Sequence, residues 1–126
     1  MPAPAVLIAD DDDLLRRLMQ RVLEAAGMRV LTAADGEQAL AVLTAEPAGI
    51  AVVVLDLTMP PHGGIETAQR VLSMRPGIGV VLTSGLPPEA AVSELLAKYR
   101  GVFLRKPFAP QALGRTVGEL IARGGA

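Results

Sequence analysis

The chain contains 126 residues, of which 51% are hydrophobic and 20% are charged, and its formal net charge is −1. This is the size of one domain, so we expect residues 1–126 to form a single domain with a core over about 5–122. The absence of cysteines and the single histidine exclude disulfides, thiolate zinc sites and multi-histidine metal sites. The balance of charges argues against a broad basic surface for nucleic acid.

The N-terminal segment and the apolar runs lack the features of export or membrane insertion. No basic residue precedes the first aspartate, and every apolar run is far shorter than a membrane span. We therefore expect a cytoplasmic protein that binds neither membranes nor nucleic acid directly.

Short aliphatic runs recur along the chain and are typical of buried strands. Each run is continuous rather than alternating between apolar and polar residues, as expected for strands that are covered on both faces. The runs cover 5–9, 29–32, 50–55, 78–82 and 102–104.

Segments with helical periodicity separate these runs. The first has apolar residues at helical spacing over 14–23, and Gly27 follows it as a helix stop. Asp35 begins the second helix, with Gln38 as its capping-box partner.

Three further helices complete the pattern. Apolar positions over 65–72 predict the third helix, Pro87-Pro88 opens the fourth, and Pro110 opens the fifth. Alternating strands and helices in this order predict an α/β, doubly wound fold with a parallel sheet, right-handed crossovers and helices on both faces.

Polar residues follow four of the predicted strands, where ligands bind in sheets of this kind. They are Asp10 to Asp13 after the first strand, Asp56 after the third, Thr83-Ser84 after the fourth and Lys106 after the fifth. Because the carboxyl ends of parallel strands meet at one edge of the sheet, we expect these side chains to converge.

Each of these residues also has an ordinary structural explanation. Asp12 or Asp13 is expected to cap the first helix. Capping does not account for Asp10 and Asp11, which lie at the strand end, where carboxylates can hold a hard divalent cation such as Mg²⁺. Taken singly, Asp56 is compatible with an aspartate in a turn, Lys106 with an exposed lysine, and Ser84 with a hydroxyl in a turn.

Taken together and in this order, the motifs resemble the receiver domain of two-component response regulators. The matching segments are 6–12, 54–60, 64–66, 82–85 and 103–108, so the resemblance extends over about 5–122. It implies a flavodoxin-like (βα)5 fold, a three-layer sandwich around a five-stranded parallel sheet of order 2-1-3-4-5.

The resemblance implies a phosphorylation site that depends on Mg²⁺ (or Mn²⁺). Asp56 matches the aspartate that accepts a phosphoryl group from a phosphohistidine. Asp11 is similar to the direct carboxylate ligand of the metal, with Asp10 acting beside it through water. The backbone carbonyl of Thr58 is expected to complete the protein ligands together with Asp56.

A second group of residues matches the family's switch. Ser84, rather than Thr83, matches the hydroxyl that binds the phosphoryl group, and Lys106 matches the family's lysine. The Lys106-Pro107 bond is expected to be cis. Phe103 falls at the aromatic position whose rotation accompanies switching.

The resemblance also implies partners. A sensor histidine kinase or a histidine phosphotransfer domain would supply the phosphoryl group, and the face of the fourth helix, fifth strand and fifth helix would control an output protein or domain. The chain would act as a non-enzymatic signalling switch, as a monomer or a weak phosphorylation-dependent homodimer. Segments 81–85 and 101–108 look most like receivers of hybrid sensor kinases.

Two alternatives stay open. A pseudo-receiver would share the fold and bind partners without being phosphorylated. A phosphatase of the haloacid dehalogenase type would use Asp10 and Asp12 as its nucleophile motif, but it needs a later acidic pair, and Asp56 is the last aspartate. The sequence also departs from the family at Gly63, where an aspartate is usual, and we interpret the nearby His62 as an exposed loop residue.

Overall fold

A computed structural model describes residues 3–45, 49–59 and 64–124 of the chain, in which strands and helices alternate. The strands are β1 (Ala5–Ala9), β2 (Arg29–Ala33), β3 (Ile50–Asp56), β4 (Gly79–Ser84) and β5 (Gly101–Arg105). The helices are α1 (Asp13–Ala25), α2 (Gly36–Ala45), α3 (Gly64–Met74), α4 (Ala90–Lys98) and α5 (Pro110–Gly124).

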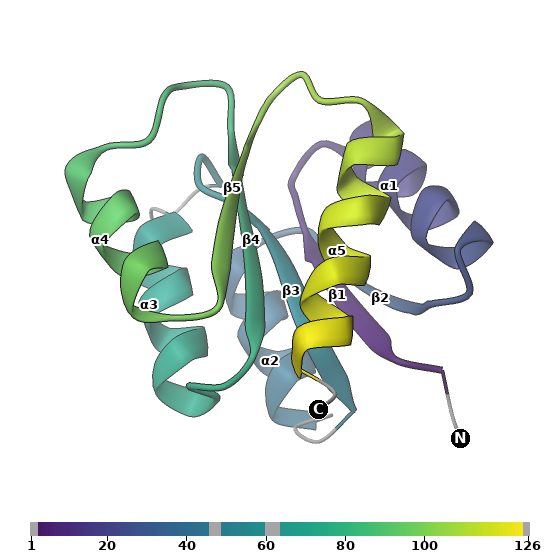
Figure 1. Ribbon diagram of the computed structural model, residues 1–126, viewed down its shortest axis with the longest axis horizontal. Coiled ribbons are helices and arrows are strands. Elements are labelled where there is room, and N and C mark those ends of the chain that lie inside the picture. Colours follow the sequence, from purple (N-terminus) through teal and green to yellow (C-terminus); the bar gives the residue numbers. More distant parts are fainter. Residues whose placement is uncertain (1–2, 46–48, 60–63, 125–126) are drawn as a thin grey trace.

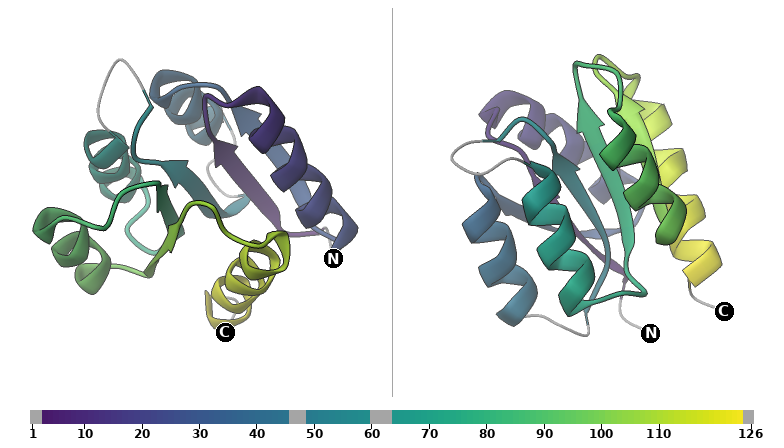
Figure 2. Two further views of the ribbon diagram at one scale, coloured as in Figure 1. Left: turned by 90° about the horizontal axis from the view of Figure 1, so that it is seen from above. Right: turned by 90° about the vertical axis from the view of Figure 1, so that its left-hand side faces the viewer.

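The strands form one parallel sheet in the order β2-β1-β3-β4-β5. Helices α1 and α5 cover one face of this sheet, and α2, α3 and α4 cover the other (Figures 1 and 2). The predicted doubly wound fold and its strand order are therefore confirmed.

Coverage on both faces explains the continuous apolar strands. In β1, Leu7 packs toward α2, α3 and α4, whereas Val6 and Ile8 pack toward α1 and α5. Every residue of β1 and β4 is buried, while the edge strands β2 and β5 are more exposed. Alternation along each strand therefore decides which layer a side chain joins.

The polar caps form where the sequence predicts them. The carboxylate of Asp12 accepts a hydrogen bond from the backbone N–H of Leu15 at 3.1 Å, which satisfies a free donor in the first turn of α1. Before α2, Asp35 Oδ1 accepts from Gln38 N at 2.8 Å, and Gln38 Oε1 accepts from Ala34 N at 3.0 Å. The Gln38 side chain thus reaches Ala34 rather than Asp35 itself, and α2 starts one residue after Asp35.

The start of α4 differs from the prediction. Pro87 and Pro88 do not begin the helix, which starts at Ala90 after an extended Glu89. A proline disfavours the helical conformation in the residue before it, so Pro88 keeps Pro87 out of the helix. The strands also run further than predicted, because β4 continues through Thr83 and Ser84 and β3 ends on Asp56.

Gly64, the first residue of α3, touches the backbone of the strand end that carries Asp56. A Cβ atom at Gly64 would lie 2.2 Å from Leu57 Cα and 2.6 Å from the Asp56 carbonyl oxygen. The backbone N–H of Gly64 also donates to the Leu57 carbonyl at 3.0 Å. Backbone cannot yield as a flexible side chain can, so this approach requires glycine.

We therefore expect Gly64→Ala to lower the free energy of unfolding by about 3 kcal/mol, because the new methyl group displaces the backbone around Asp56. Urea unfolding measures the effect. The matched control is Gly118→Ala in α5, where nothing outside the adjacent backbone of the helix lies within 4 Å of the new Cβ. That change should stabilise the helix by about 0.5–1 kcal/mol. Equal stability of Gly64→Ala and wild type would contradict the packing argument.

Candidate functional site

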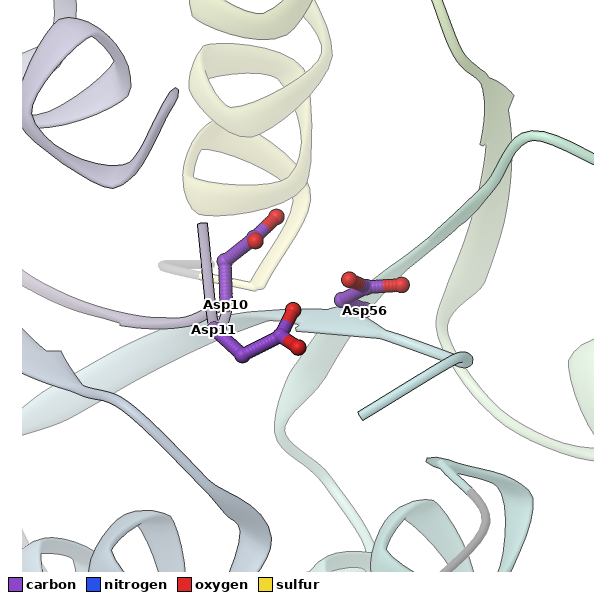
Figure 3. Close-up of side chains that lie close together, drawn as sticks. All are labelled: Asp10, Asp11 and Asp56. Atoms are coloured by element: carbon purple, nitrogen blue, oxygen red, sulfur yellow. The ribbon is translucent and has the colours of Figure 1, made fainter. Parts of the chain in front are cut away.

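Three carboxylates gather at the carboxyl-terminal edge of the sheet. Asp10 and Asp11 follow β1, Asp56 ends β3, and one oxygen from each lies within 4.8 Å of the others. Figure 3 shows the carboxylates of Asp11 and Asp56 directed into the same space. Asp10 and Asp56 are only 1% and 2% exposed, whereas Asp11 is exposed. The convergence expected from the strand ends is present.

Lys106 connects two of these carboxylates. Its Nζ donates to Asp10 Oδ2 at 2.9 Å and to Asp56 Oδ2 at 3.2 Å. Its backbone N–H donates to the Ser84 carbonyl at 2.8 Å, and the peptide bond to Pro107 is cis. The lysine that follows the edge strand β5 therefore extends across β4 to residues of β3 and of the loop after β1.

The remaining oxygens of the buried carboxylates are held by nearby backbone and hydroxyl groups. Asp56 Oδ1 accepts from Thr58 N at 2.9 Å and from Thr58 Oγ1 at 2.8 Å. Asp10 Oδ1 accepts from Asp12 N at 2.9 Å. These bonds leave little rotational freedom to the side chain of Asp56, whose two oxygens both have partners.

Two contacts of the site were not predicted from the sequence, from which only the backbone carbonyl of Thr58 was expected to take part. The Thr58 hydroxyl contacts Asp56, and Arg16 Nη1 donates to the Asp10 carbonyl at 2.7 Å. A threonine two residues after an aspartate in a turn is a local signal for the first contact. The second depends on the helical turn that brings Arg16 back over the strand end.

The carboxylate of Asp12 lies outside the pocket, because it caps α1. The phosphatase alternative would need this side chain beside Asp10. Its use as a helix cap therefore leaves that alternative without its second aspartate. The Gly63 departure and His62 lie outside the described residues.

Ser84 and Phe103 lie on the face of the sheet that α2, α3 and α4 cover, whereas Val81 and Val54 lie on the opposite face. Alternation along β4 gives Ser84 the same side as Leu82, and Phe103 packs against that core cluster. Ser84 is buried, and its Oγ accepts from Leu86 N at 3.0 Å. A pocket of about 170 Å³ opens beside it and is lined in part by Thr58, Ile65 and Val92.

The electrostatics of the pocket follow from burial and from the excess of carboxylates over lysines. Burial raises the pKa of Asp10 above its ordinary 3.8, and the hydrogen bonds from Asp12 N and Lys106 oppose this only in part. Burial by itself lowers the pKa of Lys106, but its bonds to Asp10 and Asp56 outweigh this and raise that pKa above 10.5. The ammonium is therefore charged throughout the neutral range.

The donor set of this pocket fits a hard divalent cation. Three carboxylates converge on it, and one ammonium does not neutralise them. Oxygen ligands of this kind suit Mg²⁺ or Mn²⁺, which bind one or two carboxylates and keep several waters. Asp10, Asp11 and Asp56 are the residues that would hold the ion.

Titration of Asp10 should make stability depend on pH in a defined direction. The folded protein binds a proton at Asp10 more tightly than the unfolded chain, so folding becomes less favourable as pH rises from 3.8 through the raised pKa. Asp10→Asn removes this titration. The stability of the variant relative to wild type should therefore increase across that window and then level off.

Urea unfolding in EDTA between about pH 4 and about pH 7 checks this expectation. The matched control is Asp12→Asn, which changes an exposed carboxyl outside the pocket. A difference between Asp10→Asn and wild type that stays constant with pH would contradict it.

Comparison with known proteins agrees with the arrangement of this site. A family model for the response regulator receiver domain matches residues 6–117. The chain belongs to this family. It is a receiver domain of two-component signalling with an acidic pocket formed by Asp10, Asp11 and Asp56.

Curated relatives of this receiver domain include a transcriptional regulator and a kinase. The C4-dicarboxylate transport transcriptional regulatory protein DctD of Rhizobium meliloti (strain 1021) is 35% identical over 111 residues, 88% of this chain and 24% of DctD. The sensor kinase CckA of Brucella abortus (strain 2308) is 30% identical over 118 residues, 94% of this chain and 12% of CckA. The chain thus spans a quarter or less of either relative.

Solved structures agree on the fold. A response regulator receiver domain protein from Clostridium thermocellum superposes with a TM-score of 0.87 and 24% identity, over 97% of each chain. Receiver domains bind Mg²⁺ at an acidic pocket and work with histidine kinases and output domains. Within the described ranges, no helix is long and apolar enough to cross a membrane.

Proposed function

We propose that this receiver domain is a phosphorylation-dependent signalling switch in which Asp56 accepts a phosphoryl group from the phosphohistidine of a sensor histidine kinase or a histidine phosphotransfer domain. One observation carries the proposal. The Asp56 carboxylate is 2% exposed, contacts Lys106 and lies within 4.8 Å of the carboxylates of Asp10 and Asp11.

The transfer is a displacement at phosphorus. An oxygen of Asp56 forms the new O–P bond, the N–P bond of the phosphohistidine breaks, and its electron pair stays on the imidazole. Such reactions depend mainly on positioning and charge neutralisation. Thr58 and Lys106 hold the carboxylate in place, and the ammonium of Lys106 offsets negative charge as the phosphoryl group approaches.

A bound Mg²⁺ or Mn²⁺ would supply further neutralisation of the phosphoryl oxygens. Asp10, Asp11 and Asp56 are the carboxylates that would hold the ion, and the backbone carbonyl of Thr58 is the fourth protein ligand that the family resemblance implies. Because Lys106 contacts the two buried carboxylates, it offsets part of their negative charge whenever the ion is absent.

The switch then depends on Ser84 and Phe103. The added charge of about −1.5 to −2 attracts the Ser84 hydroxyl as a donor, in place of its present bond from Leu86 N. Movement of Ser84 and of the loop that follows β4 makes room for Phe103 to turn inward from its half-buried position. This rotation changes the α4-β5-α5 face. This face would control an output protein or domain.

We place this activity in the cytoplasm, without direct binding to nucleic acid or membranes, and in a monomer or a weak phosphorylation-dependent homodimer. The domain would act as a phosphoacceptor that promotes its own phosphorylation and dephosphorylation, rather than as an enzyme acting on other substrates. The likeness to the sensor kinase CckA and to the solved receiver domain of the hybrid histidine kinase CckA supports a role in a hybrid sensor kinase.

The test is intact mass after incubation with acetyl phosphate, with Mg²⁺ or with EDTA. We expect a gain of one phosphoryl group that requires the divalent cation. A pseudo-receiver would gain no mass under either condition while keeping the same fold. Gain of a phosphoryl group in EDTA at the same rate would contradict the role assigned to the acidic pocket.

A further inference from the structure

Thr83 in β4 is fully buried, and its hydroxyl has no hydrogen-bond partner. The residue is 0% exposed, and its Oγ1 and one nitrogen of Arg75 are the buried side-chain atoms without partners among the described residues. A buried hydroxyl that makes no hydrogen bond costs stability, and a valine would fill the same space without that cost. An unpaired group of this kind requires an explanation.

The position of Thr83 in the sheet connects it to the site. It pairs in register with Asp56 on β3 and with Leu104 on β5. Residues paired in a parallel sheet share a face, and neighbouring strands lie about 4.8 Å apart. The hydroxyl therefore belongs to a residue directly beside Asp56, on the face that α1 and α5 cover.

The side chain of Lys106 crosses β4, the strand that carries Thr83. It starts after β5 and ends on Asp56 of β3 and on Asp10 beyond β1, and β4 lies between β5 and β3. Thr83 is the β4 residue in register with Asp56, so it lies on the route of the lysine. Ser84 follows it on the opposite face, with Leu82.

We propose that Thr83 is a positioning residue for Lys106, whose ammonium donates a hydrogen bond to the Thr83 hydroxyl when the phosphoryl group joins Asp56. This inference rests on the proposed function. An ammonium has three N–H donors, and in the described state two of them bind Asp10 and Asp56.

Phosphorylation changes the acceptors available to Lys106. One oxygen of Asp56 enters the O–P bond and the carboxylate loses its charge, so the ammonium moves its hydrogen bonds to the phosphoryl oxygens. The Thr83 hydroxyl, as a fixed acceptor on β4, holds the ammonium beside the reacting oxygens during this exchange. The Thr83 hydroxyl is then unpaired in the described state because its contact with Lys106 forms only when Asp56 is phosphorylated.

Two substitutions separate the hydroxyl from the shape of the side chain. Thr83→Val keeps the branched shape and removes the hydroxyl, whereas Thr83→Ser keeps the hydroxyl and removes the methyl group. For each protein, intact mass is followed over time with acetyl phosphate and Mg²⁺, and urea unfolding gives the stability. Wild type and Asp56→Asn are measured in parallel.

We expect Thr83→Val to be phosphorylated about ten- to hundredfold more slowly than wild type, the effect of one hydrogen bond to a charged group. Its stability should equal or exceed that of wild type. Thr83→Ser should react at close to the wild-type rate although it is less stable. Rate therefore follows the hydroxyl, and stability follows the methyl group.

Two results would overturn the inference alone. Thr83→Val reacting at the wild-type rate would mean that the hydroxyl has no part in the transfer. If Thr83→Ser were slowed as much as Thr83→Val, the effect would come from packing rather than from the hydroxyl. If wild type itself gained no phosphoryl group, the proposed function would fail together with this inference.

Discussion

Asp56→Asn is expected to abolish phosphoryl incorporation while the protein keeps its fold. The amide cannot supply the anionic oxygen that forms the O–P bond, so we expect the rate to fall by at least about 10³-fold. The amide oxygen can still accept the two hydrogen bonds from Thr58, and Lys106 keeps Asp10 as its partner. Stability should therefore change by no more than about 1 kcal/mol.

Intact mass and circular dichroism together check this prediction, since the first reports the acceptor and the second reports the fold. Asp12→Asn is the matched control, because Asp12 lies two residues from Asp10 but caps α1. An asparagine caps a helix as well as an aspartate, so this variant should accept a phosphoryl group like wild type. Unchanged incorporation in Asp56→Asn would show that another residue is the acceptor.

Lys106→Ala is expected to lower both stability and phosphorylation, and Mg²⁺ should restore only the stability. Without the ammonium, two buried carboxylates face each other at the strand ends. The lysine side chain is 21% exposed, so water can enter in its place, and we expect a loss of about 2–3 kcal/mol in EDTA. The carboxylates remain able to bind Mg²⁺, which should stabilise this variant more than wild type.

Even with saturating Mg²⁺, Lys106→Ala should be phosphorylated about 10²-fold or more slowly than wild type. The cation does not replace a donor held beside the reacting oxygens. Lys98 provides the matched control, since it is the other lysine of the chain and lies exposed at the end of α4. Lys98→Ala should match wild type in both measurements. If Lys106→Ala were as stable as wild type in EDTA, this result would contradict the stabilising role of the ion pairs.

The difference in stability between wild type and Lys106→Ala should depend on pH with a defined sign. The pKa of Lys106 is raised in the folded state, so its contribution to stability is complete below its unfolded value of 10.5 and is lost as pH rises through the raised value. The difference in unfolding free energy between wild type and Lys106→Ala should therefore be flat near neutral pH and shrink above 10.5.

Much of the architecture was readable from local patterns. Continuous aliphatic runs predicted every strand of the described sheet, and polar residues after those runs predicted which side chains meet. This works because burial on both faces removes the alternation of exposed strands, and because parallel strands bring their carboxyl ends to one edge. The cap at Asp12 was equally local, because it needs only residues within one helical turn.

The ends of elements were less predictable. Pro87-Pro88 was expected to open a helix, and α4 instead begins at Ala90. The strand with Thr83 and Ser84 continues two residues past the predicted end, because hydrogen bonds to β3 and β5 extend it. Pairing between strands, rather than the propensity of Thr83 or Ser84, sets that boundary.

The order of strands and helices, the aliphatic core and the identity of the residues at the strand ends could be predicted from the sequence, because these follow from local periodicity and residue chemistry. Three features became visible only in the folded chain: Lys106 reaches both Asp10 and Asp56 across β4, the Thr58 hydroxyl holds Asp56, and Thr83 is buried beside them without a partner. These contacts depend on strand register and on which face each side chain takes. A shift of one residue reverses that face, and strands that are buried at every position lack the alternation that would specify their register.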